Sequence, residues 1–346
     1  MKFNQKITLN SGHQVYIDYL RVIATVFVIG VHTVSLAASM VENGSTSFKV
    51  LECFDFAFLS CNLLFVMISG ALLLPVRGEK VSAFFRKRFS KVAIPLVVYY
   101  ILYVCAKEGI AWIYPNHWFA LFKRIFTGAP YEAPHFWLVY VILWLYVLTP
   151  FLRWLLKHIS DDVLFGVMAV IFAVCALDTY LPLFGVESPL GCFTDTFVGA
   201  FLLGYLLSEK CSKRAENFFI AGGAVSFLVS CYWIIKIGNY ENYIYQNAPT
   251  MMLFSAAIFL LIKRLSGGTE APVIIFLGKY SYSILLIHWG VLHFVVKQLL
   301  HVNVLSGGIW GGCLLMMILT LVISAVGAFL LDNTLIKWLE LPFRRK

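Results

Sequence analysis

Residues 16–34 read YIDYLRVIATVFVIGVHTV, an apolar run of helix length that carries three ionisable side chains, Asp18, Arg21 and His32. At about 100° per residue, the steps from Arg21 to His32 make three turns plus roughly 20°, so both side chains fall on one stripe of a helix. Asp18 falls within about 40° of that stripe and lies at i,i+3 to Arg21, where a charge pair can form. Ionisable groups are costly in hydrocarbon and normally face a bundle interior or a water-filled path. If this run spans a bilayer, the three residues are candidates for function.

Helical rise separates these residues along the axis. At about 1.5 Å per residue, His32 lies roughly 16 Å beyond Arg21, so Asp18 cannot orient His32 as a catalytic dyad. We expect Asp18 and Arg21 near the cytoplasmic side, and His32 toward the outer face of a core about 30 Å thick. The alternatives are an interfacial Asp18–Arg21 ion pair and a His32 that merely bonds a neighbouring helix.

The composition excludes a soluble domain. Of the 346 residues, 60% are hydrophobic and 13% are charged, against about 45–50% and 25% in soluble proteins. The apolar runs are continuous rather than alternating, which favours helices over a barrel. We therefore predict an all-α polytopic membrane protein, a bundle of about ten transmembrane helices in one domain, 1–346. The expected spans lie near 16–39, 53–75, 92–114, 136–156, 162–182, 192–209, 217–236, 249–265, 273–296 and 309–332.

The net charge of +9 follows from topology. If both termini are cytoplasmic, 21 of the 27 lysines and arginines fall on the inner side, as the positive-inside rule requires. The basic excess then needs no nucleic acid partner. We expect a multi-pass protein of the cell membrane, plasma or inner.

A basic cluster exceeds what orientation requires. It lies in the segment RGEKVSAFFRKRFSKVAIP, residues 77–95, where six of the seven charges are positive. Arg86, Lys87, Arg88 and Lys91 stand at the expected cytoplasmic mouth of the third span. Guanidinium and ammonium donors make charge-assisted bonds to phosphate oxygens, so the cluster suits an anionic ligand. Anchoring against anionic lipid is the alternative.

Six further polar or aromatic residues inside or beside the spans are candidates for a substrate pocket. They are Ser69, His135, Trp137, Tyr140, Ser281 and His288. Ser281 and His288 share a helical stripe to within about 20°. An aromatic belt is the alternative for Trp137 and Tyr140, and packing is the alternative for His288. No histidine pair has the spacing of metal ligands, so we expect no metal.

Several of these motifs resemble one known family. The pattern Asp18-x-x-Arg21-x10-His32 resembles the signature of the acyltransferase-3 family, integral membrane acyltransferases of about ten helices. The segment FVMISG is similar to that family's F-F-x-x-S-G, and the basic cluster to its R-x-x-R element before a proline. The blocks HFWLVYVILWLYVLTP and GKYSYSILLIH also resemble family blocks, so the resemblance covers most of the chain.

The resemblance implies acyl transfer, usually of acetyl, from a cytoplasmic acyl-CoA to a hydroxyl of a glycan or glycolipid on the outer side. His32 takes the place of the catalytic histidine, Arg21 that of the motif arginine, and Arg88 with Lys91 that of the R-x-x-R element. Lys91 departs from the family pattern, since lysine lacks the bidentate geometry of arginine. The chain looks most like standalone O-acetyltransferases of surface polysaccharides or their lipid-linked precursors, such as the enterobacterial common antigen O-acetyltransferase.

We therefore expect acetyl-CoA as co-substrate, a glycan or glycolipid acceptor, contact with membrane lipid, no metal and no nucleic acid. The residues expected to bind the acyl-CoA are Arg86, Lys87, Arg88 and Lys91. His32, Arg21 and Asp18 are the expected catalytic set. His32 would act as general base, or alternatively would form an acyl-histidine intermediate. The competing function is a transporter or flippase that uses Asp18, Arg21 and His32 as a substrate or proton path, although no inverted repeat is evident.

Overall fold

The structure is all-helical over the part of the chain it describes. The computed structural model describes residues 14–75, 78–127, 132–238, 240–245 and 247–344, and every regular element in these ranges is a helix or helical turn. Within them, eight helices are long and apolar enough to cross a membrane. In lipid, backbone groups must be satisfied inside each segment, which a helix achieves. The chain is a multi-pass integral membrane protein.

The eight candidate spans match eight of the ten expected ones. Three are single helices, namely α1 (Val15–Ala38), α2 (Thr46–Leu73) and α3 (Val81–Glu108). The others are helices with short helical extensions: α5 (Trp137–His158), α6 (Asp161–Tyr180), α9 (Lys213–Tyr232), α12 (Pro272–Gly290) and α13 (Ile309–Leu331), the last running on into α14 (Lys337–Arg344).

The two remaining expected spans, near 192–209 and 249–265, correspond to shorter helices. The first is α8 (Val198–Tyr205), which begins after a left-handed Phe197 and continues through a five-residue π turn. The second is α11 (Pro249–Leu265), of 17 residues. At about 1.5 Å per residue, both fall short of a core about 30 Å thick. The count of ten stays a prediction, as does the cytoplasmic side of the termini, whose residues 1–13 and 345–346 lie outside the described ranges.

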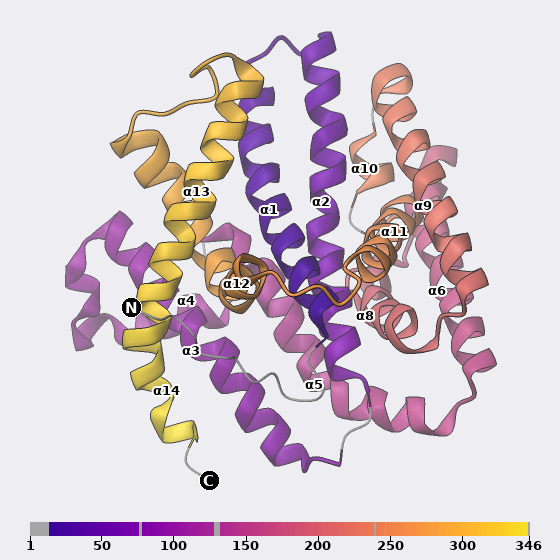
Figure 1. Ribbon diagram of the computed structural model, residues 1–346, viewed down its shortest axis with the longest axis horizontal. Coiled ribbons are helices and arrows are strands. Elements are labelled where there is room, and N and C mark those ends of the chain that lie inside the picture. Colours follow the sequence, from indigo (N-terminus) through magenta and orange to yellow (C-terminus); the bar gives the residue numbers. More distant parts are fainter. Residues whose placement is uncertain (1–13, 76–77, 128–131, 239, 246, 345–346) are drawn as a thin grey trace.

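Helices α1 and α2 run side by side through the middle of the bundle (Figure 1). On one side α12 packs against α1, and α13 packs against α12. On the other side α8 and α11 pack against α2, and α9 packs against α11. The largest core cluster joins these layers, with Leu20, Leu64, Phe201 and Phe259 fully buried.

Two glycines bring α2 and α8 into backbone contact. A Cβ at Gly70 would collide with the backbone carbonyl of Phe201, and a Cβ at Gly204 would collide with that of Met67. Small residues at such a crossing let helices approach closely, which is a main source of packing energy between membrane helices. This crossing fixes α2 against α8.

We expect Gly70→Ala and Gly204→Ala each to lower the melting temperature of the purified protein, because the added methyl group must push the two backbones apart. Overpacking of this kind costs about 1–3 kcal/mol. The control is Gly166→Ala on α6, where no atom lies within 4 Å of the new Cβ. Alanine there should leave the melting temperature unchanged or raise it, since it is the better helix former. Equal behaviour of the three variants would contradict this account of the crossing.

Candidate functional site

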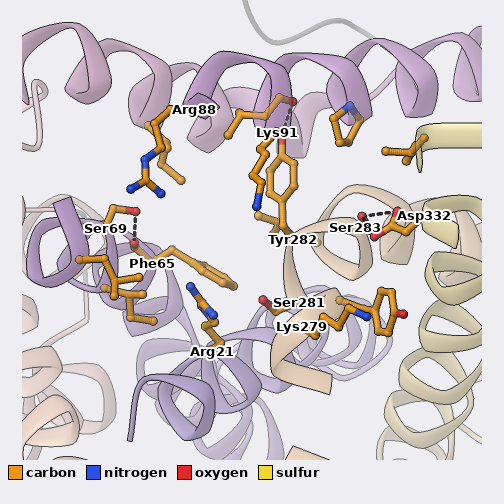
Figure 2. A pocket seen from close by; sticks show the side chains of 18 of the residues that line it. Arg21, Phe65, Ser69, Arg88, Lys91, Lys279, Ser281, Tyr282, Ser283 and Asp332 are labelled. Atoms are coloured by element: carbon orange, nitrogen blue, oxygen red, sulfur yellow. Dashed lines mark hydrogen bonds between the residues drawn. The ribbon is translucent and has the colours of Figure 1, made fainter. Parts of the chain in front are cut away.

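A first cavity, of about 560 Å³, opens between α1, α2, α3, α5, α12 and the C-terminal helical segment. Its described lining includes five cationic side chains: Arg21, Arg88, Lys91, Lys279 and Lys337. In Figure 2 the guanidinium groups of Arg21 and Arg88 point into the cavity from opposite walls, and the Lys91 ammonium points in from α3. The three lysines are exposed, whereas both arginines are partly buried. The cavity is thus open on its lysine side. Asp332 and Glu340 also line it, so five cationic side chains stand against two carboxylates, and this excess of positive charge suits an anionic ligand.

Arg21 is held by Asp18, as the spacing predicted. The Arg21 Nη1 atom lies 3.3 Å from Asp18 Oδ1, and the Asp18 side chain is only 5% exposed. Gly278 of α12 lies against this carboxylate, since a Cβ at position 278 would lie 3.0 Å from the Asp18 Cβ. Asp18 is not among the lining residues. Its place is behind Arg21, where it positions the guanidinium.

The basic cluster is part of helix α3 itself and does not lie outside its start. Helix α3 begins at Val81, eleven residues before the expected start near 92. Arg88 and Lys91, at i,i+3, therefore share a face, and that face lines the cavity. Arg86 and Lys87, which were also expected to bind acyl-CoA, are exposed and do not line it.

Lys279 and Lys337 were not singled out from the sequence. Lys279 stands two residues before Ser281 in the block that resembles the family, and Lys337 lies after the last expected span. The charge asymmetry between the two sides of the membrane predicts only that both lie on the inner side. The fold brings them to the cavity because α12 packs against α13, whose end leads to Lys337.

A second cavity, of about 690 Å³, contains His32. Its polar lining comes from five described residues on separate parts of the chain: His32, Asn62, His135, Asp195 and Tyr245. The rings of Trp137 and Phe197, 5.7 Å apart, form an aromatic part of the wall. Ligand sites typically combine such an apolar or aromatic lining with a few polar groups that fix orientation.

Three histidine rings meet at this cavity. The His288 ring centroid lies 5.2 Å from that of His32 and 5.1 Å from that of His135. His288 is fully buried and lines neither cavity, so it reaches the second one only through the other two histidines.

Main-chain carbonyls orient two of the rings. His288 Nδ1 lies 2.7 Å from the carbonyl oxygen of Leu285, and His135 Nε2 lies 3.0 Å from that of Leu286. Because a carbonyl can only accept, each of these ring nitrogens must be the donor. The opposite nitrogens, His288 Nε2 and His135 Nδ1, are buried and make no hydrogen bond to the described residues. In neutral rings both are lone-pair acceptors beside His32.

The residues expected to form one substrate pocket lie in different parts of the structure. Ser69 and Ser281 line the first cavity. The Ser69 hydroxyl donates to the carbonyl of Phe65 (Figure 2), and the Ser281 hydroxyl donates to that of Gly278. Trp137 lines the second cavity with His135. Tyr140 lines neither, because its hydroxyl donates to the carbonyl of Ile125 at 2.8 Å. Four of the six residues therefore divide between the two cavities, whereas Tyr140 and His288 line neither.

The histidine cluster does not form a metal site. Among the described residues, no group of three or more histidine, cysteine, aspartate or glutamate side chains has an arrangement that could hold a metal ion. The arrangement offers imidazole nitrogens as bases at one cavity and an excess of cationic side chains at the other.

The chain matches a known protein family. A family model described as an acyltransferase domain matches residues 14–331. The matched range contains the whole lining of the second cavity and most of the first, with Lys337 beyond its end. Searches of curated proteins and of solved structures gave no match.

The first cavity predicts a binding result. If coenzyme A, the co-substrate expected from the sequence, binds in this cavity, Lys279→Ala and Lys337→Ala should each weaken its binding about three- to tenfold, because each would remove one charge-assisted contact to phosphate. Isothermal titration of the purified protein measures the effect. Lys87→Ala is the matched control, since this exposed lysine of α3 lies outside the cavity. If Lys87→Ala weakened binding as much as the other two, general surface charge rather than the cavity would be responsible.

Proposed function

The chain belongs to the acyltransferase family, and from that membership we propose that this membrane protein is an O-acyltransferase. It moves an acyl group, acetyl in our proposal, from acyl-CoA to a hydroxyl of a glycan or lipid-linked sugar. The observation that carries the proposal is the pair of cavities, one lined by five cations and the other containing His32. The donor and the acceptor then have separate binding sites.

The donor occupies the first cavity. Its phosphates pair with Arg88 and Lys91 of α3 and with the two lysines at the opening. The pantetheine arm extends past Arg21 toward His32. We assign this opening to the cytoplasmic side, where the positive-inside rule places most of the basic residues and where acyl-CoA would be supplied.

The acceptor occupies the second cavity. Asn62 and Asp195 offer an amide and a carboxylate to sugar hydroxyls, and the Trp137 ring offers an apolar face. We place the acceptor among surface polysaccharides or their lipid-linked precursors, on the outer side of the membrane. Membrane lipid surrounds the bundle, and the transfer needs no nucleic acid and no metal.

His32 is the base in the proposed reaction. It takes the proton of the acceptor hydroxyl as that oxygen attacks the thioester carbonyl carbon. The new C–O bond forms, the C–S bond breaks, and the leaving thiolate receives the proton from His32, which yields the ester and free coenzyme A. In the competing sequence a His32 nitrogen attacks first and an acyl-histidine forms. In either case Asp18 acts only through Arg21, about 16 Å away from His32 along the helix.

His32→Ala should reduce transfer of radiolabelled acetyl from acetyl-CoA to a glycolipid extract by about 10²–10⁴-fold, the usual contribution of a general base. Coenzyme A binding should be retained, because His32 does not line the first cavity. His158→Ala is the control, since this exposed histidine ends α5 away from both cavities. Full activity of His32→Ala would overturn the mechanism. Passage of a glycolipid across liposomes without thioester consumption would favour a flippase instead.

The acceptor site gives a second kinetic prediction. Asp195→Asn should raise the apparent KM for the glycolipid acceptor about three- to tenfold, because the carboxylate loses its charge-assisted bond to a hydroxyl. The KM for acetyl-CoA should stay within twofold. Asp162→Asn, at the exposed start of α6, is the matched control. A change in the acetyl-CoA KM instead would place Asp195 with the donor.

A further inference from the structure

The two cavities share one lining residue. Leu285 of α12 borders the first cavity and also the second, and no other described residue lines both. Its side chain is buried, at 3% exposure. The two cavities thus adjoin at this side chain, which lies on the route that the proposed acyl transfer to His32 would take.

Buried apolar side chains line both cavities and belong to the same core cluster as Leu285. Phe65 and Ile142 line the first cavity, whereas Cys61 and Leu138 line the second, and all four are buried. Such a wall does not attract water or phosphate, but it admits a hydrocarbon group of suitable size. The chemistry of the wall thus matches the acyl end of the donor and excludes its nucleotide end.

The backbone at Leu285 is held in place. Its carbonyl oxygen accepts the bond from His288, and the next carbonyl, of Leu286, accepts from both His135 and the Tyr103 hydroxyl. The Tyr103 hydroxyl in turn accepts from the backbone N–H of Gly290 at 2.8 Å. Because His135 and Tyr103 hold this turn of α12 from other elements and the His288 bond stiffens it from within, the bulk of the Leu285 side chain sets the width of the passage.

We propose that Leu285 is the partition between the donor and acceptor cavities and that its side-chain volume selects a short acyl group. The proposal rests on the proposed function. An acetyl methyl group shares the space beside Leu285, whereas each further methylene must displace it. A hydrophobic site discriminates one methylene by about 10- to 200-fold, so one side chain is sufficient to set the preference.

The test compares acetyl-CoA with butyryl-CoA as donors and uses a glycolipid extract as the acceptor. The measured quantity is the ratio of kcat/KM for butyryl-CoA to that for acetyl-CoA. Leu285→Ala should raise this ratio about tenfold or more over the unmodified protein. Leu285→Phe should lower kcat for acetyl transfer while the KM for acetyl-CoA stays within twofold, because the nucleotide site is untouched.

Leu286→Ala is the matched control. Leu286 is the adjacent residue, is fully buried and lines neither cavity. The loss of its side chain removes the same volume and leaves its carbonyl bonds in place. Its ratio should equal that of the unmodified protein. If Leu285→Ala does not fold, Leu285→Val replaces it. Valine removes less volume than alanine does, so the ratio should rise in the same direction by a smaller factor.

The outcomes separate the two proposals. The partition is overturned if the protein transfers acyl groups but Leu285→Ala or Leu285→Val leaves the ratio unchanged. It is also overturned if Leu286→Ala shifts the ratio as much as Leu285→Ala does. In both cases the assignment as an enzyme stands. Absence of acyl transfer from either donor in the unmodified protein, with coenzyme A still bound, overturns the proposed function and the partition with it.

Discussion

The packing of α12 against α1 is the contact on which both cavities depend. At one end, Gly278 lacks a side chain and so leaves room for the Asp18 carboxylate that holds Arg21 beside the first cavity. At the other end, His288 lies against His32 at the second cavity. A single helix pair thus carries a buried ion pair at one cavity and paired imidazoles at the other.

Buried polar groups in such a bundle need partners, because an unmade hydrogen bond in a low dielectric is costly. The structure meets much of this need with main-chain carbonyls. Those of Leu285 and Leu286 receive bonds from His288 and His135, while Ser281 donates back within its own helix. Site residues are therefore oriented by helical backbone, which is rigid. The orientations of the His288 and His135 rings, and so of their acceptor nitrogens, are therefore set by main-chain carbonyls rather than by other side chains.

The expected helix boundaries were least accurate where a helix begins with charged residues or is short, because hydropathy does not detect either kind of helix well. The hydropathy of residues 77–91 is low, so the third span was expected to start near 92, although lysine and arginine are good helix formers and α3 begins at Val81. The left-handed backbone at Phe197 ends the helical path on its N-terminal side, and α8 is short for that reason. Hydropathy reports apolar length, whereas a helix end depends on local backbone geometry.

The sequence by itself determined the helical membrane class, eight of the expected spans, the Asp18–Arg21 pair and its separation from His32, because run length, i,i+3 spacing and helical rise are local properties of one chain segment. Only the tertiary structure decided which distant residues share a cavity. It brought Lys279 and Lys337 to the arginines and His288 between two other histidines, and it left Tyr140 outside. These neighbours belong to helices far apart in the chain, and their contacts follow from how helices pack rather than from spacing along the sequence.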